Sequence, residues 1–342
     1  MTETVLVTGG TGFVAGWCVA GLLDRGYAVR TTIRDPAKES AVRAAAGGRE
    51  GLSFAVADLT RHEDWDAAVA GCDYVLHVAS PLGGDGRGTD ESLVAPARDG
   101  ALRVLAAAAR AGVKRVVMTS STAAATPSDG RGVSDETVWT DPTGPGLTPY
   151  RRSKLLAERA AWDFMAAQAG AGGTTLTTIL PVAIFGPVLS RGNASSVDIV
   201  GRLLAGRPPL LPRFGFTIVD VRDLADLHIR AMTAPEAAGE RFIAGGEFMW
   251  LADIARTLRE HLGDRAGKVP GRGVPDGVVR ALARFVPDLR ALTPLLGRQL
   301  TFSGAKAQRM LGFTPRPATA TIVDCAESLL PARSLIDHTP AR

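Results

Sequence analysis

Short apolar runs alternate with longer amphipathic stretches through the first half of the chain. The runs are rich in valine, isoleucine and threonine, and they predict strands at Val5–Val7, Ala28–Ile33, Ser53–Ala57, Tyr74–Val78, Arg115–Thr119 and Thr175–Leu180. The amphipathic stretches predict helices at Phe13–Arg25, Trp65–Ala70, Ser92–Ala111 and Tyr150–Ala169. Since apolar strands separated by helices are typical of parallel sheets covered on both faces, the fold class is α/β with a doubly wound parallel sheet.

This regular alternation ends at Pro181, where proline and glycine become frequent. The later segments Gly201–Arg213, Trp250–Leu262 and Val274–Leu296 predict helices and loops of a smaller lobe. We therefore expect a sheet domain over 1–180, with 216–235 returning to it, a substrate-binding lobe over 181–215 and 236–330, and a tail over 331–342. A glycine-rich loop (83–88) and a polar segment (128–147) follow the fourth and fifth strands, at the sheet edge where ligands bind.

The composition is that of an ordinary globular protein, with 46% hydrophobic and 22% charged residues among 342. The net charge of +4 is scattered along the chain, so we expect no nucleic-acid partner. No apolar run is long enough to span a membrane, and an apolar strand begins at Val5 without a leader pattern. The three cysteines and five histidines lack metal-ligand spacing, so we expect no metal. The three cysteines also lack redox spacing and are most simply buried thiols, which predicts a cytoplasmic protein. Monomer and homodimer both remain open.

A glycine-rich turn, Thr8-Gly9-Gly10-Thr11-Gly12-Phe13-Val14-Ala15-Gly16, follows the first strand. Its spacing and its strand–turn–helix context indicate a Rossmann-type dinucleotide site. Gly9 permits the turn, Gly12 lets the backbone approach a pyrophosphate, and Ala15 keeps the helix close to the strand. The amino end of the helix then offers free N–H groups to phosphate. A tight turn without a ligand is the simpler alternative.

The end of the second strand carries the preference between NAD and NADP. An acidic residue there would accept the ribose hydroxyls of NAD, but this chain has Arg34, followed by Lys38. An arginine can bind a 2′-phosphate with two hydrogen bonds, which predicts NADP(H) as the cofactor, although Arg34 could instead be neutralised by Asp35. Asp58 and Leu59, just past the third strand, are expected near the adenine. Alternatively, Asp58 caps the helix that holds Trp65.

Tyr150 and Lys154 are four residues apart, which places them on one face of a helix. A phenol titrates near pH 10, and a neighbouring cation brings its pKa towards neutrality. Such a pair can act as a general acid, although the same spacing also occurs on solvated helix faces.

Thr119-Ser120-Ser121 ends the fifth strand, at the sheet edge that the Tyr150 helix and the glycine turn also reach. Together these motifs resemble the extended short-chain dehydrogenase/reductase family. The closer resemblance is to its dihydroflavonol reductase, cinnamoyl-CoA reductase and aldehyde (methylglyoxal) reductase branch, and it covers nearly the whole chain. It is carried further by His77-Val-Ala-Ser-Pro81, the Ser153–Trp162 segment, and Val219-Asp-Val-Arg-Asp-Leu-Ala225.

The resemblance implies an NADPH-dependent reductase of a small carbonyl compound, with a hydrophobic or aromatic substrate expected. Tyr150 would protonate the carbonyl oxygen, Lys154 would bind the nicotinamide ribose and lower the pKa of Tyr150, and Ser121 would hold the substrate oxygen. The full set of expected cofactor-binding residues is Gly9, Thr11, Gly12, Phe13, Val14, Arg34, Lys38, Asp58, Leu59, Val78, Ala79, Ser80, Thr119, Tyr150, Lys154, Pro181, Ala183 and Ile184.

The chain also departs from the family's patterns. Flavonoid reductases carry Asn five residues past the serine, where this chain has Thr126, and Thr-Pro-Tyr-Arg-Arg-Ser-Lys differs from the cinnamoyl-CoA reductase pattern around the tyrosine. Both differences argue against those substrates. Two other functions stay open: a nucleotide-sugar epimerase or dehydratase, which returns its cofactor unchanged, and a non-catalytic NADP-binding sensor.

Overall fold

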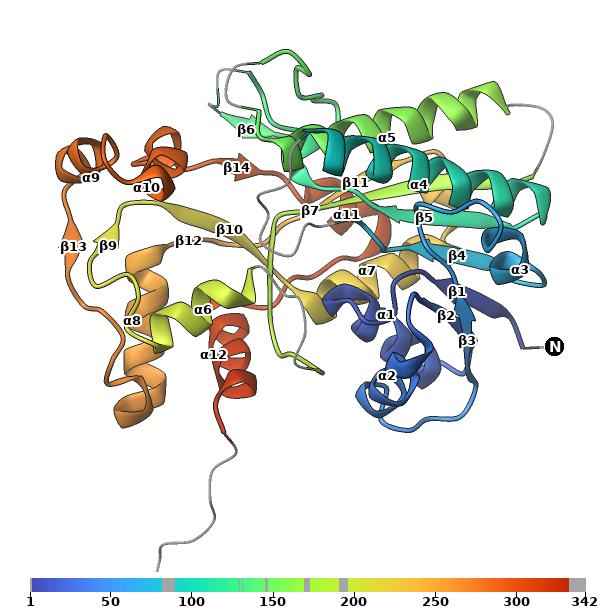
Figure 1. Cartoon of the computed structure of the whole chain (residues 1–342), viewed down its shortest axis with the longest axis horizontal. Helices are drawn as coiled ribbons and strands as arrows, with labels where there is room; N and C mark the ends of the chain where they lie inside the picture. The colour runs from blue at the N-terminus through green and yellow to red at the C-terminus, as the bar shows by residue number, and fades with distance from the viewer. Residues whose placement is uncertain are drawn as a thin grey trace, which may run out of the picture.

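The computed structural model describes residues 2–81, 90–128, 130, 132–144, 147–168, 173–190 and 196–331, so the glycine-rich loop over 83–88 lies outside the described residues. Seven parallel strands form the main sheet, in the order β11-β7-β5-β4-β1-β2-β3 (Figure 1). Their bounds are β1 (Thr4–Val7), β2 (Ala28–Ile33), β3 (Leu52–Val56), β4 (Tyr74–His77), β5 (Arg115–Thr119), β7 (Thr175–Pro181) and β11 (Arg241–Ala244). The strand order reverses between β1 and β4, and this reversal opens a ligand crevice at the carboxyl ends. The expected Rossmann-type fold is confirmed.

The last strand of this sheet was not expected there. β11 lies within 236–330, which the sequence analysis assigns to the smaller lobe, yet it pairs in parallel with β7 from Thr178 to Pro181. Phe242 and Ile243 are fully buried, so this short strand completes the sheet edge.

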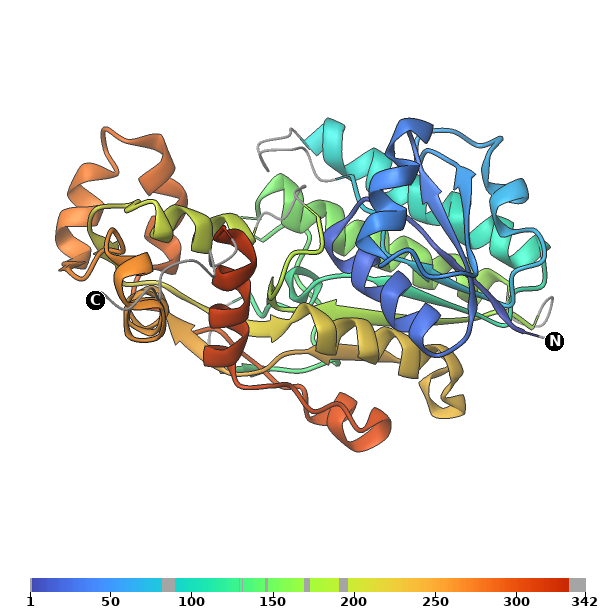
Figure 2. The same cartoon turned by 90° about the horizontal axis from the view of Figure 1, so that it is seen from below.

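Helices cover both faces of the sheet (Figures 1 and 2). Because side chains alternate along a strand, Val5 and Val7 of β1 pack with α1 (Phe13–Asp24) and α7 (Val221–Thr233). Leu6 points to the other face, where α3 (Trp65–Val69), α4 (Asp90–Arg110) and α5 (Pro149–Ala167) lie. α2 (Glu39–Ala45) connects β2 to β3.

A second, smaller core lies beside the sheet. It is built on β8 (Ala183–Phe185), β10 (Gly215–Asp220) and β12 (Phe248–Trp250), packed with α6 (Val197–Leu204), α8 (Leu251–Leu262) and α12 (Ala318–Leu329). These three helices gather on one side of the lobe in Figure 1. The remaining α-helices are α9 (Asp276–Leu282), α10 (Pro287–Leu292) and α11 (Ala305–Leu311). The remaining strands form two pairs, β6 (Val133–Ser134) with β14 (Thr301–Phe302) and β9 (Leu211–Pro212) with β13 (Gly273–Val274).

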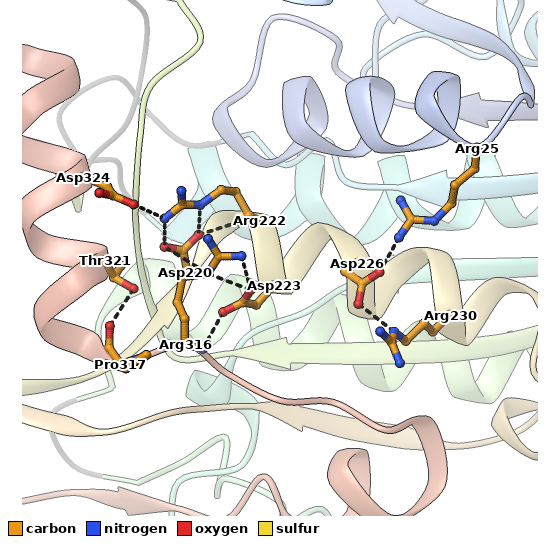
Figure 3. A network of polar contacts seen from close by, with 10 residues as sticks. All are labelled: Arg25, Asp220, Arg222, Asp223, Asp226, Arg230, Arg316, Pro317, Thr321 and Asp324. Atoms are coloured by element: carbon orange, nitrogen blue, oxygen red, sulfur yellow. Dashed lines mark hydrogen bonds and ion pairs between the residues drawn. The ribbon is translucent and has the colours of Figure 1, made fainter.

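Two arginines lie between three carboxylates where the C-terminal segment meets β10 and α7 (Figure 3). Arg222 binds the fully buried Asp220 through Nε at 2.8 Å and Nη2 at 2.7 Å, and also reaches Asp324 of α12 at 2.6 Å. Arg316 binds Asp223 at 2.7 Å. Burial would raise the pKa of Asp220, but the hydrogen bonds and charge of Arg222 lower it. This cluster, the C-terminal clamp, fixes α12 against β10 and α7.

Among the described residues, no helix has the length and apolar character needed to cross a bilayer. Within the same part of the chain, no group of three His, Cys, Asp or Glu side chains is placed to hold a metal ion.

Candidate active site

The glycine turn lies at the carboxyl end of β1, and Gly12 is the N-cap of α1. Gly9 has φ of +76°, which only glycine adopts readily, and a Cβ there would lie 3.0 Å from the Cβ of Ala79. A Cβ on Gly10 would lie 2.4 Å from the hydroxyl of Thr31. No described side chain caps the amino end of α1, and the first turn of this helix has no acidic residue. The free N–H groups of this helix end therefore fit a phosphate.

Thr8 ties this turn to the end of β4. Its hydroxyl accepts the N–H groups of Val78 at 3.0 Å and Ala79 at 2.9 Å, and donates to Nδ1 of His77 at 3.0 Å. Burial, helped by the charge of Lys154, lowers the pKa of His77 to about 3, so this histidine is a neutral anchor. The contacts bring Val78, Ala79 and the half-buried Ser80 beside the glycines.

Arg34 and Lys38 are both exposed just past β2. Arg34 forms no ion pair with any described residue. The carboxylate of Asp35 accepts the N–H of Ala37 at 2.9 Å, as the cap of the short helix Pro36–Lys38. The alternative in which Asp35 neutralises Arg34 thus finds no contact to support it, and the exposed guanidinium is accessible to an anion.

Asp58 holds the turn after β3 rather than the next helix. It accepts the N–H of Thr60 at 2.8 Å and its hydroxyl at 2.7 Å, and these bonds lower the pKa of Asp58, as does the charge of Arg34. The N-cap of α3 is Asp64, so the alternative in which Asp58 caps that helix is wrong. Leu59 packs against Gly100, and a Cβ placed on Gly100 would lie 2.8 Å from the Cβ of Leu59.

The three expected catalytic residues come from two elements. Ser121 follows β5 and caps the short helix Thr122–Ala124, where its Oγ accepts the N–H of Ala123 at 3.2 Å. Tyr150 lies in the first turn of α5. Burial raises the pKa of Tyr150, and the nearby side chain of Ser121 opposes that shift. The phenol is therefore a protonated donor at neutral pH.

Lys154 lies one helical turn further and is only 7% exposed. Its amine donates to the carbonyl of Thr119 at 3.4 Å. Burial lowers the pKa of Lys154 to about 8, and the charge of Glu158 opposes this. We expected Lys154 to lower the pKa of Tyr150. In this structure the pKa of the phenol is raised instead, because burial has the largest effect on it.

The side chain of Thr119 points to the face of the sheet that α7 covers. Its hydroxyl lies 2.7 Å from Nε2 of His228, whose Nδ1 donates to the carbonyl of Leu224 at 2.8 Å. Since a carbonyl only accepts, Nδ1 carries a proton, and in the neutral imidazole Nε2 then accepts from Thr119. Burial lowers the pKa of His228 to about 4. Thr119 can thus meet a cofactor through its backbone only.

The residues at the end of β7 and just after it are fixed by contacts with neighbouring elements of the site. The carbonyl of Pro181 accepts the hydroxyl of Thr122 at 3.3 Å, and the half-buried Ala183 and Ile184 pair with β10. The indole of Trp17 in α1 donates to the carbonyl of Pro187 at 2.9 Å. This segment is therefore tied directly to the helix that starts at the glycine turn.

Two features of the site were not foreseen. Gly10 was given no role, although Thr31 leaves no room for a side chain there. Thr126, the counterpart of the flavonoid reductases' Asn, is buried and donates its hydroxyl to the carbonyl of Thr122 at 2.9 Å. The sequence alone does not reveal this role of Gly10, because Thr31 reaches the turn only when β2 pairs with β1.

The model of the NAD dependent epimerase/dehydratase family matches residues 5–245. The chain belongs to this family. Cinnamoyl-CoA reductase 1 of Petunia hybrida is 37% identical over 263 residues, which cover 75% of this chain and 76% of that protein. Ketoreductase azaE of Aspergillus niger is 32% identical over an alignment of 355 residues, which covers 96% of this chain and 98% of that protein.

Among solved structures, the chain is similar to yeast methylglyoxal/isovaleraldehyde reductase Gre2, crystallised with NADPH. The TM-score is 0.80 and the identity 27%, with 96% of this chain and 98% of that chain covered. The resemblance to the reductase branch of the extended short-chain dehydrogenases/reductases is confirmed, and the chain is an oxidoreductase.

Proposed function

We propose that the protein reduces an aldehyde or ketone to an alcohol, with NADP(H) as its cofactor. The observation that carries the proposal is the meeting of three side chains at the end of β5: Ser121 acts on the phenol of Tyr150, and the buried Lys154, one helical turn further along α5, donates to the carbonyl of Thr119. The glycine turn fits a pyrophosphate, and the exposed Arg34, which forms no ion pair within the described part of the chain, fits a 2′-phosphate. The reductase relatives, including one solved with NADPH, support the same function.

Each catalytic group has a separate task. NADPH, when bound, supplies hydride to the carbonyl carbon. The phenol of Tyr150 donates its proton to the carbonyl oxygen, where negative charge develops. The hydroxyl of Ser121 holds that oxygen in place. Lys154, cationic below about pH 8, binds ribose hydroxyls and attracts the phenolate left on Tyr150.

The remaining cofactor contacts are assigned along the same crevice. Thr11, Phe13 and Val14 would meet the pyrophosphate, Lys38 would assist Arg34, and Asp58 with Leu59 would meet the adenine. Val78–Ser80 and the carbonyl of Thr119 would line one side, and Pro181, Ala183 and Ile184 the nicotinamide side. We assign 1–180 and 216–235 to the cofactor, and 181–215 and 236–330 to the substrate, except β11, which completes the main sheet.

A hydrophobic or aromatic carbonyl compound is the proposed substrate. The names of the relatives span ketones, aldehydes and a CoA thioester. The Thr-Pro-Tyr-Arg-Arg-Ser-Lys segment and the internally bonded Thr126 favour aldehydes and ketones over CoA thioesters and flavonoids.

The test is NADPH oxidation across aldehydes, diketones, keto esters and cinnamoyl-CoA, for the natural protein and for Tyr150→Phe. We expect turnover with some free carbonyl compounds, and its loss by at least about a hundredfold in Tyr150→Phe, with NADPH affinity retained. An active Tyr150→Phe would remove the acid from its role. Tight NADPH binding without oxidation would favour a sensor, and conversion without net oxidation an epimerase.

A further inference from the structure

A buried carboxylate follows the proposed catalytic lysine by one helical turn. Tyr150, Lys154 and Glu158 are spaced by four residues along α5, so their side chains lie on one face of the helix. Glu158 is fully buried. A buried carboxylate is costly, and it persists only where hydrogen bonds and a countercharge compensate for the lost water.

The compensation comes from strands of the sheet and from the next turn of α5. Oε2 of Glu158 accepts the hydroxyl of Ser120 at 2.6 Å, and Oε1 accepts the hydroxyl of Thr178 at 2.8 Å. Nε of Arg241 donates to Oε1 at 2.8 Å, and the indole of Trp162 lies 3.4 Å from the same oxygen. Both carboxylate oxygens therefore accept hydrogen bonds, and the guanidinium of Arg241 supplies the countercharge.

Arg241, from β11, is held as firmly as its partner. Nη1 donates to the carbonyls of Glu136 at 2.6 Å and Val138 at 3.1 Å, and the guanidinium lies 3.6 Å from the ring centre of Trp139. The charge of Glu158 thus has a fixed position, one helical turn after Lys154. Its bond to Ser120 reaches the residue directly before Ser121.

We propose that Glu158 is a positioning residue of the reductase: it holds the backbone that carries Ser121, and its charge keeps Lys154 protonated. The inference rests on the proposed function and extends it to a residue that touches neither substrate nor cofactor. The carboxylate acts through Ser120 on one side and through the electric field along α5 on the other.

The charges around Lys154 fix the sign of the effect. His77 from β4 and Tyr150 from α5 are neutral near pH 7, and Arg241 from β11 lies behind Glu158. Glu158 is the group whose charge opposes the effect of burial on Lys154. Without that charge the pKa of Lys154 falls, so the amine loses its proton at lower pH, and the alkaline limb of the activity profile moves to lower pH.

The experiment compares Glu158→Gln with the double variant Glu158→Gln/Arg241→Gln, which leaves no unpaired buried cation. Two quantities are measured: the pH profile of kcat/KM with saturating NADPH, and the pH at which Lys154 becomes acetylated by acetic anhydride, followed by mass spectrometry. We expect both to shift down by about one pH unit in either variant. Glu158→Asp keeps the negative charge. The alkaline limb of its kcat/KM profile should therefore lie at the same pH as in the natural protein, even if kcat is reduced.

Asp220→Asn is the matched control. It removes a fully buried carboxylate from the arginine pair of the C-terminal clamp (Figure 3) and should destabilise the fold without moving the limb. An unmoved Lys154 labelling profile in a folded Glu158 variant, or the same shift in Asp220→Asn, would overturn the inference. The labelling needs no turnover, so it still tests Glu158 if the natural protein reduces no carbonyl compound.

Discussion

Replacing Gly9 by alanine separates the backbone requirement of the glycine turn from its packing requirement. Gly9 has φ of +76°, and placing a side chain in that region costs about 1 kcal/mol. The added Cβ would also lie 3.0 Å from the Cβ and 3.2 Å from the Cα of Ala79. Ala79 cannot retreat freely, because its N–H is bound to Thr8 at 2.9 Å. Overpacking adds about 1–3 kcal/mol, for a total of about 2–4 kcal/mol.

Gly26→Ala provides the comparison. Gly26 has φ of +80°, and no described atom lies within 4 Å of a Cβ placed there. It therefore carries the same backbone cost without the crowding. Urea unfolding should show a loss of about 1 kcal/mol for Gly26→Ala and a clearly larger loss for Gly9→Ala.

NADPH binding, followed by fluorescence titration, is the second measurement. The displaced turn should weaken binding by at least about tenfold in Gly9→Ala, while Gly26→Ala should bind as the natural protein does. Equal stability losses in the two variants, or unchanged NADPH affinity in Gly9→Ala, would show that the contact with Ala79 does not constrain the turn.

Two further predictions concern charge. Arg34→Asp should weaken NADPH binding by about 10–100-fold and leave NADH binding equal or better, because a charge-assisted contact with the 2′-phosphate is lost; unchanged discrimination in titrations with both cofactors would exclude this role. The pKa of His228 is about 4 in the folded chain against an ordinary 6.5, so the unfolded chain gains protons first and stability should fall as pH drops from about 6.5 towards 4. Urea midpoints at pH 7 and pH 5 should differ less in His228→Gln than in the natural protein, and an equal difference would contradict the assignment.

The features that follow from local sequence were predicted well. The six strands of the first half and the glycine turn depend on short apolar runs and on residue types at neighbouring positions, and the structure contains them. Ser121 and the Lys154 amine both lie at the end of β5, because parallel strands bring their carboxyl ends to one edge, while the catalytic roles of Ser121, Tyr150 and Lys154 stay predictions.

Features that depend on distant contacts were missed. Glu158 has the sequence appearance of a solvated helix charge, and its partner Arg241 comes from β11, a four-residue strand that follows the break in the regular pattern. The two meet only when β11 pairs with β7, a contact that the spacing along the chain does not reveal. The raised pKa of Tyr150 likewise depends on burial by the whole fold.

The C-terminal clamp bears on how far the chain can be shortened. Asp223 is only 9% exposed, and the guanidinium that neutralises it arrives from Arg316, long after the sheet has been completed at Ala244. A protein cut before Arg316 would retain every strand of the main sheet yet leave this carboxylate without its countercharge. Engineering at this end should therefore extend the polypeptide beyond α12 rather than trim it back.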